Sequence, residues 1–281
     1  MTAPGKPFTL NDLRTAATTK QRVAMLTCYD FTTATILESA GVPMLLVGDS
    51  ASNVILGHRS TIPITLDLIM QLTAAVKRGA PRTLVMGDMP FGSYQASDAQ
   101  GIENVCRMLK ETNCDCVKLE AGASLVPMFA RLADAGIAAV AHIGLRPQAV
   151  GLMGGYRYQG RTAAEARAIV DLAVQFSRAG AAALMLEAVP PEVGQRVVER
   201  VNIPVIGCGA GPHCHAHVVV LQDLLRHTST QPRFVPQPSG SSLIEIARNY
   251  VTEISSGTYP QLAHCYQMVD GESRKFLSEQ L

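Results

Sequence analysis

Eight short apolar runs alternate with helical patterns between residues 23 and 225, and this alternation restricts the fold more than any other feature. The runs are rich in β-branched or small apolar residues and lack the apolar–polar alternation of a half-exposed strand. Strands of this kind are buried on both faces, and their alternation with helices predicts a parallel sheet. The runs cover residues 23–28, 44–48, 83–87, 115–120, 137–143, 181–187, 203–207 and, less clearly, 218–224.

The number of strand–helix units favours closure of this sheet into a barrel. Eight units fit a (β/α)8 barrel better than an open, doubly wound sheet, and the 281 residues compare with roughly 250 in a typical barrel. Hydrophobic residues make up 47% of the chain, but aromatic residues only 5%, with no Trp. The core must therefore be aliphatic, which suits the layered interior of a TIM barrel. We expect one α/β domain over residues 1–281.

Several helices have recognisable ends. A capping-box pattern, TAAE, begins at Thr162, and Pro191 is well placed as a first helical residue. Ser242 opens what we expect to be the last helix, which ends at Gly257. Residues 226–241 are rich in Pro, Ser and Thr and predict an irregular segment within the domain.

Charge and cysteine content indicate which partners and compartment to expect. The net charge is +1, from 24 basic and 23 acidic residues without a basic stripe, so we expect neither nucleic acid nor a membrane as a partner. The seven cysteines are odd in number and scattered through apolar runs, which is typical of thiols in a reducing compartment. No signal peptide or run of roughly 20 apolar residues is present. We expect a cytoplasmic protein that binds small molecules.

Acidic residues stand at the ends of three successive runs. Asp49 follows the second run, Asp88 the third, and Glu120 closes the fourth. The carboxyl ends of barrel strands gather at one face, so these carboxylates would come from adjoining strands about 4.8 Å apart. A hard cation such as Mg²⁺ prefers oxygen ligands and would offset their repulsion. The alternative is that they are helix caps or surface loop acids.

Four further groups near the strand ends are candidate functional groups. Lys118 lies two residues before Glu120, so both side chains share a face and Lys118 can reach whatever the metal holds. Glu187 ends the sixth run and is a candidate general base, or a Glu paired with a nearby Arg or His. His142 is a hydrogen-bond partner of the substrate or of an acid, or a structural His. Glycines at 207–211 either admit a ligand to the backbone or form a tight turn into the next helix.

Many segments, in one order, resemble the ketopantoate hydroxymethyltransferase family (3-methyl-2-oxobutanoate hydroxymethyltransferase). The similarity runs from about residue 20 to residue 211 and resumes near residue 242. The matching segments are TCYD at 27–30, LVGDS at 46–50, GHRSTIPIT at 57–65, AAVKRGAP at 74–81, GDMPFGSY at 87–94, VKLEAG at 117–122, AHIGLRPQ at 141–148, GGYRYQGR at 154–161, LMLEAVP at 184–190, PVIGCGAG at 204–211 and SGTYPQLAH at 256–264.

The resemblance implies a (β/α)8 barrel of the superfamily of phosphoenolpyruvate mutase and isocitrate lyase, and a homo-oligomer, commonly a decamer. It implies transfer of a hydroxymethyl group from 5,10-methylenetetrahydrofolate to 3-methyl-2-oxobutanoate, giving 2-dehydropantoate through an enolate stabilised by Mg²⁺. The residues carried over are Asp49, Asp88 and Glu120 for the metal, Asp49, Ser50, Asp88 and Lys118 for the oxo acid, and Glu187 as the proton acceptor.

Two segments depart from the family pattern. After GAG the family commonly has Cys/Thr-Asp-Gly-Gln, whereas residues 212–217 read PHCHAH, which we interpret as a drifted turn at the start of a helix. A soft-metal site on these His and Cys residues is the alternative, but its spacing matches no recognised zinc pattern. The usual His-Asp-Leu-Leu-Gly becomes QDLLR at 222–226. These changes bear on folate binding and subunit packing.

Two other functions compete with the transferase. One is a carbon–carbon lyase of the wider superfamily acting on a 2-oxo acid, although the Lys-Lys-Cys-Gly-His type segment of such enzymes is missing from the sequence. The other is a paralogue with impaired folate use or no catalysis. The complete set of Asp49, Asp88, Glu120, Lys118 and Glu187 favours an active transferase.

Overall fold

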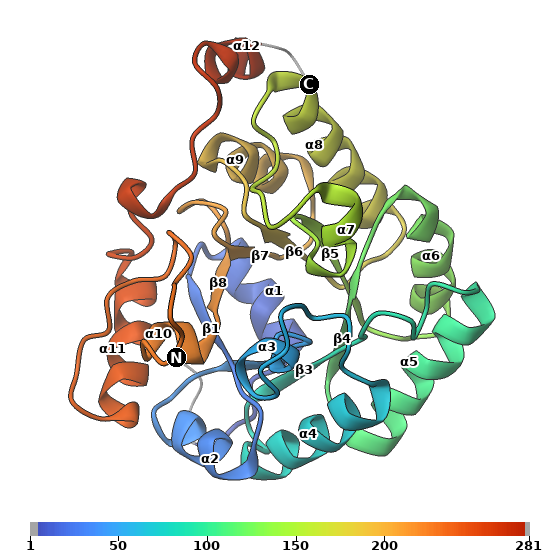
Figure 1. Cartoon of the computed structure of the whole chain (residues 1–281), viewed down its shortest axis with the longest axis vertical. Coiled ribbons are helices and arrows are strands. Elements are labelled where there is room, and N and C mark those ends of the chain that lie inside the picture. Colours follow the sequence, from blue (N-terminus) through green and yellow to red (C-terminus); the bar gives the residue numbers. More distant parts are fainter. Residues whose placement is uncertain (1–4, 279–281) are drawn as a thin grey trace.

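The computed structural model describes residues 5–278, in which eight parallel strands close into one barrel surrounded by helices (Figure 1). Each strand pairs with the next along the chain, and β8 pairs with β1, so the sheet has no open edge. The expected (β/α)8 barrel is confirmed. The strands are β1 (Val23–Thr27), β2 (Met44–Val47), β3 (Leu84–Asp88), β4 (Cys116–Glu120), β5 (Ala139–Gly144), β6 (Ala183–Glu187), β7 (Val205–Cys208) and β8 (Ala216–Val219).

The helices form a ring outside the strands, apart from a few at the barrel ends (Figure 1). Within residues 5–278, no helix has both the length and the apolar character needed to cross a membrane. The helices are α1 (Leu10–Thr18), α2 (Phe31–Ser39), α3 (Ala51–Val54), α4 (Leu66–Gly79), α5 (Asp98–Thr112), α6 (Val126–Asp134), α7 (Val150–Met153), α8 (Ala163–Arg178), α9 (Pro191–Arg200), α10 (Leu221–Leu224), α11 (Leu243–Ser256) and α12 (Glu272–Ser278), with 3-10 turns η1 (Ala123–Leu125), η2 (Pro147–Ala149) and η3 (Leu262–His264).

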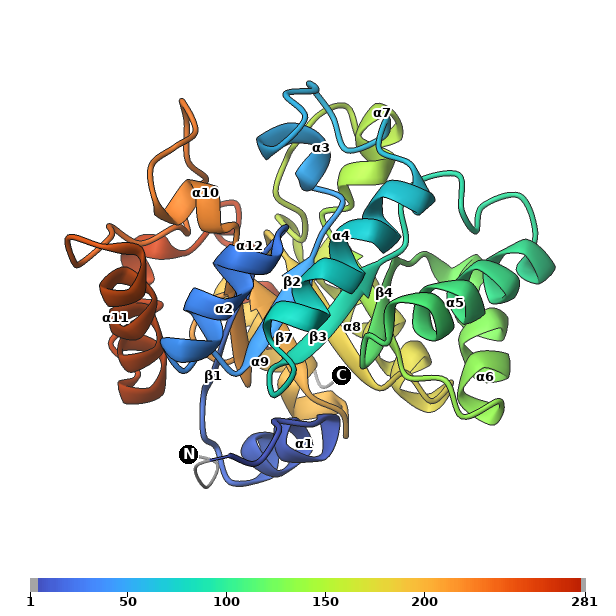
Figure 2. The same ribbon diagram turned by 90° about the horizontal axis from the view of Figure 1, so that it is seen from below.

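Helix α1 closes the N-terminal end of the barrel. It buries Leu13 and Ala16 in the same apolar cluster as Val23 and Met44, which begin their strands. Figure 2 shows α1 at the opposite end of the molecule from α3 and α7. Within residues 5–278, α1 therefore covers the barrel at the N-terminal ends of its strands, and the barrel opens into a cavity at their C-terminal ends.

On four neighbouring strands, the inward-facing side chain changes from apolar to polar toward the C-terminal end. Side chains two residues apart on a strand share a face, so each polar group stands directly above an apolar one. The apolar layer lies within the inner core cluster, and the polar layer forms the floor of the open end. The pairs are Met86 and Asp88 in β3, Cys116 and Lys118 in β4, Val140 and His142 in β5, and Met185 and Glu187 in β6.

The expected helix ends are confirmed. Thr162 caps α8 through a complete capping box, and Pro191 is the first residue of α9. Ser242 caps α11, and Gly257 follows it in the left-handed region at φ +78°. Helix α11 is not the last helix, because α12 follows it. All seven cysteines are free thiols, and all except Cys106 are at least partly buried.

The predictions around the eighth strand were partly wrong. Strand β8 begins at Ala216, so the expected strand at 218–224 overlaps it by only two residues, and α10 follows instead. The Leu221 N–H leaves the sheet and donates to Thr27 Oγ1 at 3.0 Å. No helix starts at 212–217 either, because the His215 N–H bonds to the Val205 carbonyl at 2.9 Å and leads the chain directly into β8.

Residues 226–241 contain neither helix nor strand, but they are fixed to the barrel. Phe234 and Val235 are buried, and the Phe234 carbonyl accepts a hydrogen bond of 2.6 Å from the Tyr259 hydroxyl. Arg226 donates to the Pro236 carbonyl at 2.9 Å. The segment therefore packs as part of the domain over its C-terminal end.

The buried His217 makes the stability of the fold sensitive to acid. Its side chain lies in β8 with Nε2 unpaired, and burial, reinforced by Arg22 and His215, lowers its pKa to about 3. The folded state therefore binds fewer protons than the unfolded state, whose histidine titrates near 6.5. The stability contributed by neutral His217 is complete above pH 6.5 and is lost as the pH falls toward 3.

We predict that replacing His217 with Leu reduces the steepness of this acid destabilisation by up to one proton, about 1.4 kcal/mol per pH unit. Urea unfolding between pH 4 and pH 7 measures the slope. The exposed His227 provides the control, because His227→Leu should leave the slope unchanged. Equal slopes in the wild type and His217→Leu would contradict the assignment.

Candidate active site

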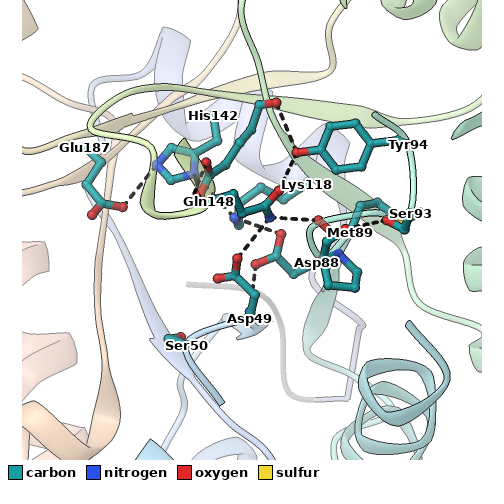
Figure 3. Close-up of polar contacts among 12 residues, drawn as sticks. Asp49, Ser50, Asp88, Met89, Ser93, Tyr94, Lys118, His142, Gln148 and Glu187 are labelled. Carbon is teal, nitrogen blue, oxygen red and sulfur yellow. Dashed lines mark hydrogen bonds and ion pairs between the residues drawn. The ribbon is translucent and has the colours of Figure 1, made fainter. Parts of the chain in front are cut away.

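The polar strand ends meet in one cavity of about 730 Å³ at the C-terminal end of the barrel. Asp49, Asp88, Lys118, His142 and Glu187 all line it, and Ser50 lies beside them (Figure 3). Glu120 lines a separate, adjacent cavity of about 420 Å³. The structure thus brings all but one of the predicted site residues to the same cavity.

An ion pair between Asp88 and Lys118 stands at the centre of this cavity. Asp88 Oδ1 lies 2.8 Å from Lys118 Nζ, and the two side chains are 0% and 3% exposed. Asp88 Oδ2 accepts a hydrogen bond of 2.8 Å from the Asp49 N–H, so β3 also holds the chain that leaves β2. Lys118 Nζ is 3.4 Å from His142 Nδ1. One ammonium group therefore links residues from β3, β4 and β5.

Gln148 connects the predicted carboxylates, and sequence reasoning missed it. Its Nε2 donates to Asp49 Oδ2 at 2.9 Å, and its backbone N–H lies 3.0 Å from each Glu120 oxygen. Its own Oε1 accepts from the Tyr94 hydroxyl at 2.8 Å and from Gln95 Nε2 at 3.1 Å. The only signal in the sequence was its place in the AHIGLRPQ segment. Gln148 therefore separates Glu120 from the main cavity and orients Asp49.

Ser50 is positioned by the tight turn after β2. Its Oγ lies 2.8 Å from the Tyr29 hydroxyl, and α3 begins at the next residue. A Cβ on Gly48 would lie 2.8 Å from this Oγ, so only glycine leaves room for the hydroxyl there. The turn thus places Asp49 and Ser50 together at the cavity wall.

Burial perturbs the titration of the acidic groups. Desolvation, opposed by the charge of Lys118, raises the pKa of Asp88 to about 7 and that of Glu120 to about 9. Burial works to lower the pKa of Lys118, but the nearby carboxylates, Asp88 first, hold it above its usual range. A single ammonium is thus surrounded by more carboxylates than it can neutralise, and a further cation would relieve this imbalance.

The oxygen donors in this corner fit a hard divalent cation. In residues 5–278, no three His, Cys, Asp or Glu side chains are grouped so that they alone could hold a metal ion. Mg²⁺ commonly takes only one or two protein carboxylates and completes its octahedron with water and substrate oxygens. Asp49 and Asp88 line the cavity, and Asp88 Oδ1 has no aligned hydrogen bond besides its ion pair. This arrangement is compatible with such an open site.

Glu187 lies in the same cavity, in contact with His142. Its Oε2 lies 3.0 Å from His142 Nε2, in a contact short of a well-aligned hydrogen bond, and its side chain is 17% exposed. Lys118 occupies the other ring nitrogen, so Nδ1 carries the lone pair and Nε2 the proton. Burial, with the charge of Lys118, lowers the pKa of His142 and keeps it neutral. Glu187 therefore contacts a neighbouring histidine while its carboxylate lines the cavity.

The glycine run after β7 serves packing. A Cβ on Gly207 would lie 2.9 Å from Cys214 Sγ, and one on Gly209, at φ +72°, would collide with the Phe234 ring. His215 Nδ1 accepts the Val205 N–H at 3.0 Å. The run therefore lets residues 212–217 and the irregular segment pack against β7, and the helix expected after it is absent from this stretch.

The chain shares its fold with solved barrels of the phosphoenolpyruvate mutase type. Phosphoenolpyruvate phosphomutase from Streptomyces platensis subsp. rosaceus has a TM-score of 0.57 at 15% identity, over 78% of this chain and 83% of that one. Phosphonopyruvate hydrolase in complex with oxalate and Mg²⁺ has a TM-score of 0.55 at 12% identity, over 89% and 99%. Fold and site together define a (β/α)8-barrel enzyme.

Sequence comparison gives the family. The sequence model of ketopantoate hydroxymethyltransferase matches residues 7–262, so this chain belongs to that family and is a transferase. A 3-methyl-2-oxobutanoate hydroxymethyltransferase from Geobacillus kaustophilus is 43% identical over 253 residues, covering 89% of this chain and 91% of its own. Another, from Thermobifida fusca, is 43% identical over 260 residues, covering 92% and 93%.

We predict that Gln148→Ala destabilises the protein by about 1–3 kcal/mol, because it removes the amide donor to Asp49 inside a buried network. Urea unfolding measures the loss. The matched control is Gln95→Ala, which removes an exposed side chain that donates to Gln148 and should cost less than about 1 kcal/mol. An equal loss in both variants would show that Gln148 does not organise the carboxylates.

Proposed function

We propose that this protein transfers a hydroxymethyl group from 5,10-methylenetetrahydrofolate to 3-methyl-2-oxobutanoate, giving 2-dehydropantoate. The observation that carries the proposal is the pairing of two polar groups in one cavity. Asp49, Asp88 and Lys118 form a corner for the small oxo acid that accepts the hydroxymethyl group, and we call it the acceptor corner. Glu187 lies on the other side of the cavity, in contact with His142. Membership of the ketopantoate hydroxymethyltransferase family supports the oxo-acid substrate and the transfer of a hydroxymethyl group, and the folate donor is proposed from the family resemblance.

Mg²⁺ is the proposed metal, held by Asp49 and Asp88, with Glu120 standing behind Gln148. When bound, it supplies Lewis-acid polarisation of the 2-oxo group and so acidifies the hydrogen on C3. Lys118 adds a fixed positive charge where negative charge develops on the substrate oxygen. Because the ammonium is buried and already oriented by Asp88, little reorganisation accompanies the reaction.

Glu187 is the proposed base that removes the C3 proton. The neutral His142 directs its Nε2–H toward one Glu187 oxygen, which orients the carboxylate. The resulting carbon nucleophile attacks the methylene carbon of the donor. One carbon–nitrogen bond of the donor breaks in this attack, and the released nitrogen takes up the proton that Glu187 removed from C3. Water then replaces the second nitrogen on the methylene carbon, leaving its hydroxyl on that carbon and its proton on the nitrogen, so that the hydroxymethyl product and tetrahydrofolate leave.

The reaction is tested by assaying 2-dehydropantoate formation with and without Mg²⁺ and the folate donor. We expect product only when both are present. Formation of product in the absence of the folate donor would indicate the rival carbon–carbon lyase. Failure to exchange the C3 hydrogen with solvent in the presence of Mg²⁺ would indicate a non-catalytic paralogue.

We predict that Glu187→Gln lowers the rate of C3–H exchange in deuterated water by about 10²–10⁴-fold, because the amide cannot accept the proton. Proton NMR of 3-methyl-2-oxobutanoate measures the exchange. Binding of the oxo acid should change less than about threefold, since the acceptor corner is untouched. Glu199→Gln, at an exposed position on α9, is the matched control. Normal exchange in Glu187→Gln excludes this role.

We also propose a cytoplasmic homo-oligomer, as the family resemblance implies. Large apolar side chains are exposed on the single chain, among them Leu152 at 87% and Leu262 at 77%, and burial in subunit contacts would remove them from water. Light scattering coupled to gel filtration tests this. A mass equal to the 30.0 kDa chain would exclude the oligomer.

A further inference from the structure

The outer part of the active-site cavity is lined by aromatic rings from three separate segments. Tyr158 comes from the loop before α8, Phe234 from the irregular segment, and Tyr266 from the chain after η3. The Tyr158 and Tyr266 rings are stacked at 4.7 Å with an interplanar angle of 12°, and Phe234 meets Tyr266 at 6.4 Å and 65°. These contacts hold the three segments in one wall.

The cavity is larger than the oxo acid needs. Its volume of about 730 Å³ is within the range of about 300–1,000 Å³ for pockets that bind drug-sized ligands. A five-carbon oxo acid at Asp49 and Lys118 leaves the outer part free. A second ligand with a ring system therefore fits between the acceptor corner and the aromatic wall.

Asp223 is a buried carboxylate in this outer part that the proposed mechanism does not use. It is 8% exposed and lines the cavity from α10. Its Oδ1 accepts a hydrogen bond of 2.6 Å from Thr228 Oγ1, and Thr228 is held in turn by Gln231 Nε2. Within residues 5–278, no donor reaches Asp223 Oδ2. A fixed, desolvated acceptor that faces a cavity is suited to a ligand with N–H donors.

Arg161 marks the rim of the same region. Its guanidinium lies 5.2 Å from the Tyr158 ring centroid, and no carboxylate of the described chain forms an ion pair with it. A guanidinium stacked on an aromatic ring keeps its planar edge of donors available, and that edge matches a carboxylate. The region thus offers an acceptor at one point, rings along its wall and a cation at its rim.

We propose that this outer region binds the one-carbon donor, with Asp223 accepting hydrogen bonds from the N–H edge of its heterocycle and Arg161 binding a carboxylate of its tail. The proposal rests on the proposed function, which places the oxo acid in the inner corner. The irregular segment, through Thr228 and Phe234, then shapes the donor site. Asp223 positions the donor and takes no part in removing the C3 proton.

The first test is Asp223→Asn, which keeps an acceptor for Thr228 but turns an NH₂ group toward the ligand. We expect the KM for 5,10-methylenetetrahydrofolate and the Kd for tetrahydrofolate to rise about tenfold or more, because two donors then face each other. C3–H exchange of the oxo acid without donor should remain at the wild-type rate. Calorimetry on the full chain with Mg²⁺ and oxo acid measures the Kd.

Two fragments of the donor separate the two contacts. Asp223→Asn should weaken binding of tetrahydropterin and spare p-aminobenzoylglutamate, whereas Arg161→Ala should do the reverse. Arg200→Ala, an exposed position at the end of α9, is the matched control and should change neither. The unfolding midpoint of each variant shows whether it is folded.

The outcomes distinguish this proposal from the proposed function. A tetrahydrofolate Kd within twofold of wild type in Asp223→Asn, with normal C3–H exchange, overturns the donor site and leaves the transferase intact. Absence of C3–H exchange in the wild-type protein overturns the proposed function itself. Equal losses for both fragments in both variants indicate general disruption and also overturn the assignment.

Discussion

The buried ion pair between Asp88 and Lys118 is the interaction on which the rest of the site depends. Lys118 gives Asp88 a partner away from water, and Asp88 in turn fixes the Asp49 backbone and so the turn after β2. Removing one partner from such a pair commonly costs about 3–5 kcal/mol, because the other charge stays buried and alone. The same ammonium determines which nitrogen of His142 carries the proton, and through it the orientation of Glu187. The charge of Lys118 therefore organises both the acceptor corner and the proposed base.

Much of this arrangement was predictable, because strand periodicity determines which side chains meet. Asp88, Lys118 and Glu187 each stand two residues beyond an inward apolar side chain, so the barrel geometry alone brings them together. Gln148 could not be found this way. It lies in a 3-10 turn, where no periodicity marks a functional face, and its role depends on side-chain contacts with residues 28 to 99 positions away.

The eighth strand was misplaced for a different reason. The run at 218–224 has the apolar composition of a strand, but a buried helical turn has the same composition, and α10 takes its second half. What places β8 earlier is the backbone of His215, which joins the ladder of β7 through Val205. Residues that depart from the family pattern at 212–217 are thus structural in this protein. The irregular segment at 226–241 is different, because it reaches the cavity through Thr228 and Phe234.

Helix α1 closes the barrel at the N-terminal ends of its strands. With Leu13 and Ala16 packed beneath the strands, Lys118 faces the cavity at the other end, which the aromatic wall also lines. A small molecule bound at the closed end of such a cavity cannot leave while a larger ligand occupies the outer part. The proposed donor site therefore implies an order of binding, with the oxo acid entering before the donor and tetrahydrofolate leaving before the hydroxymethyl product.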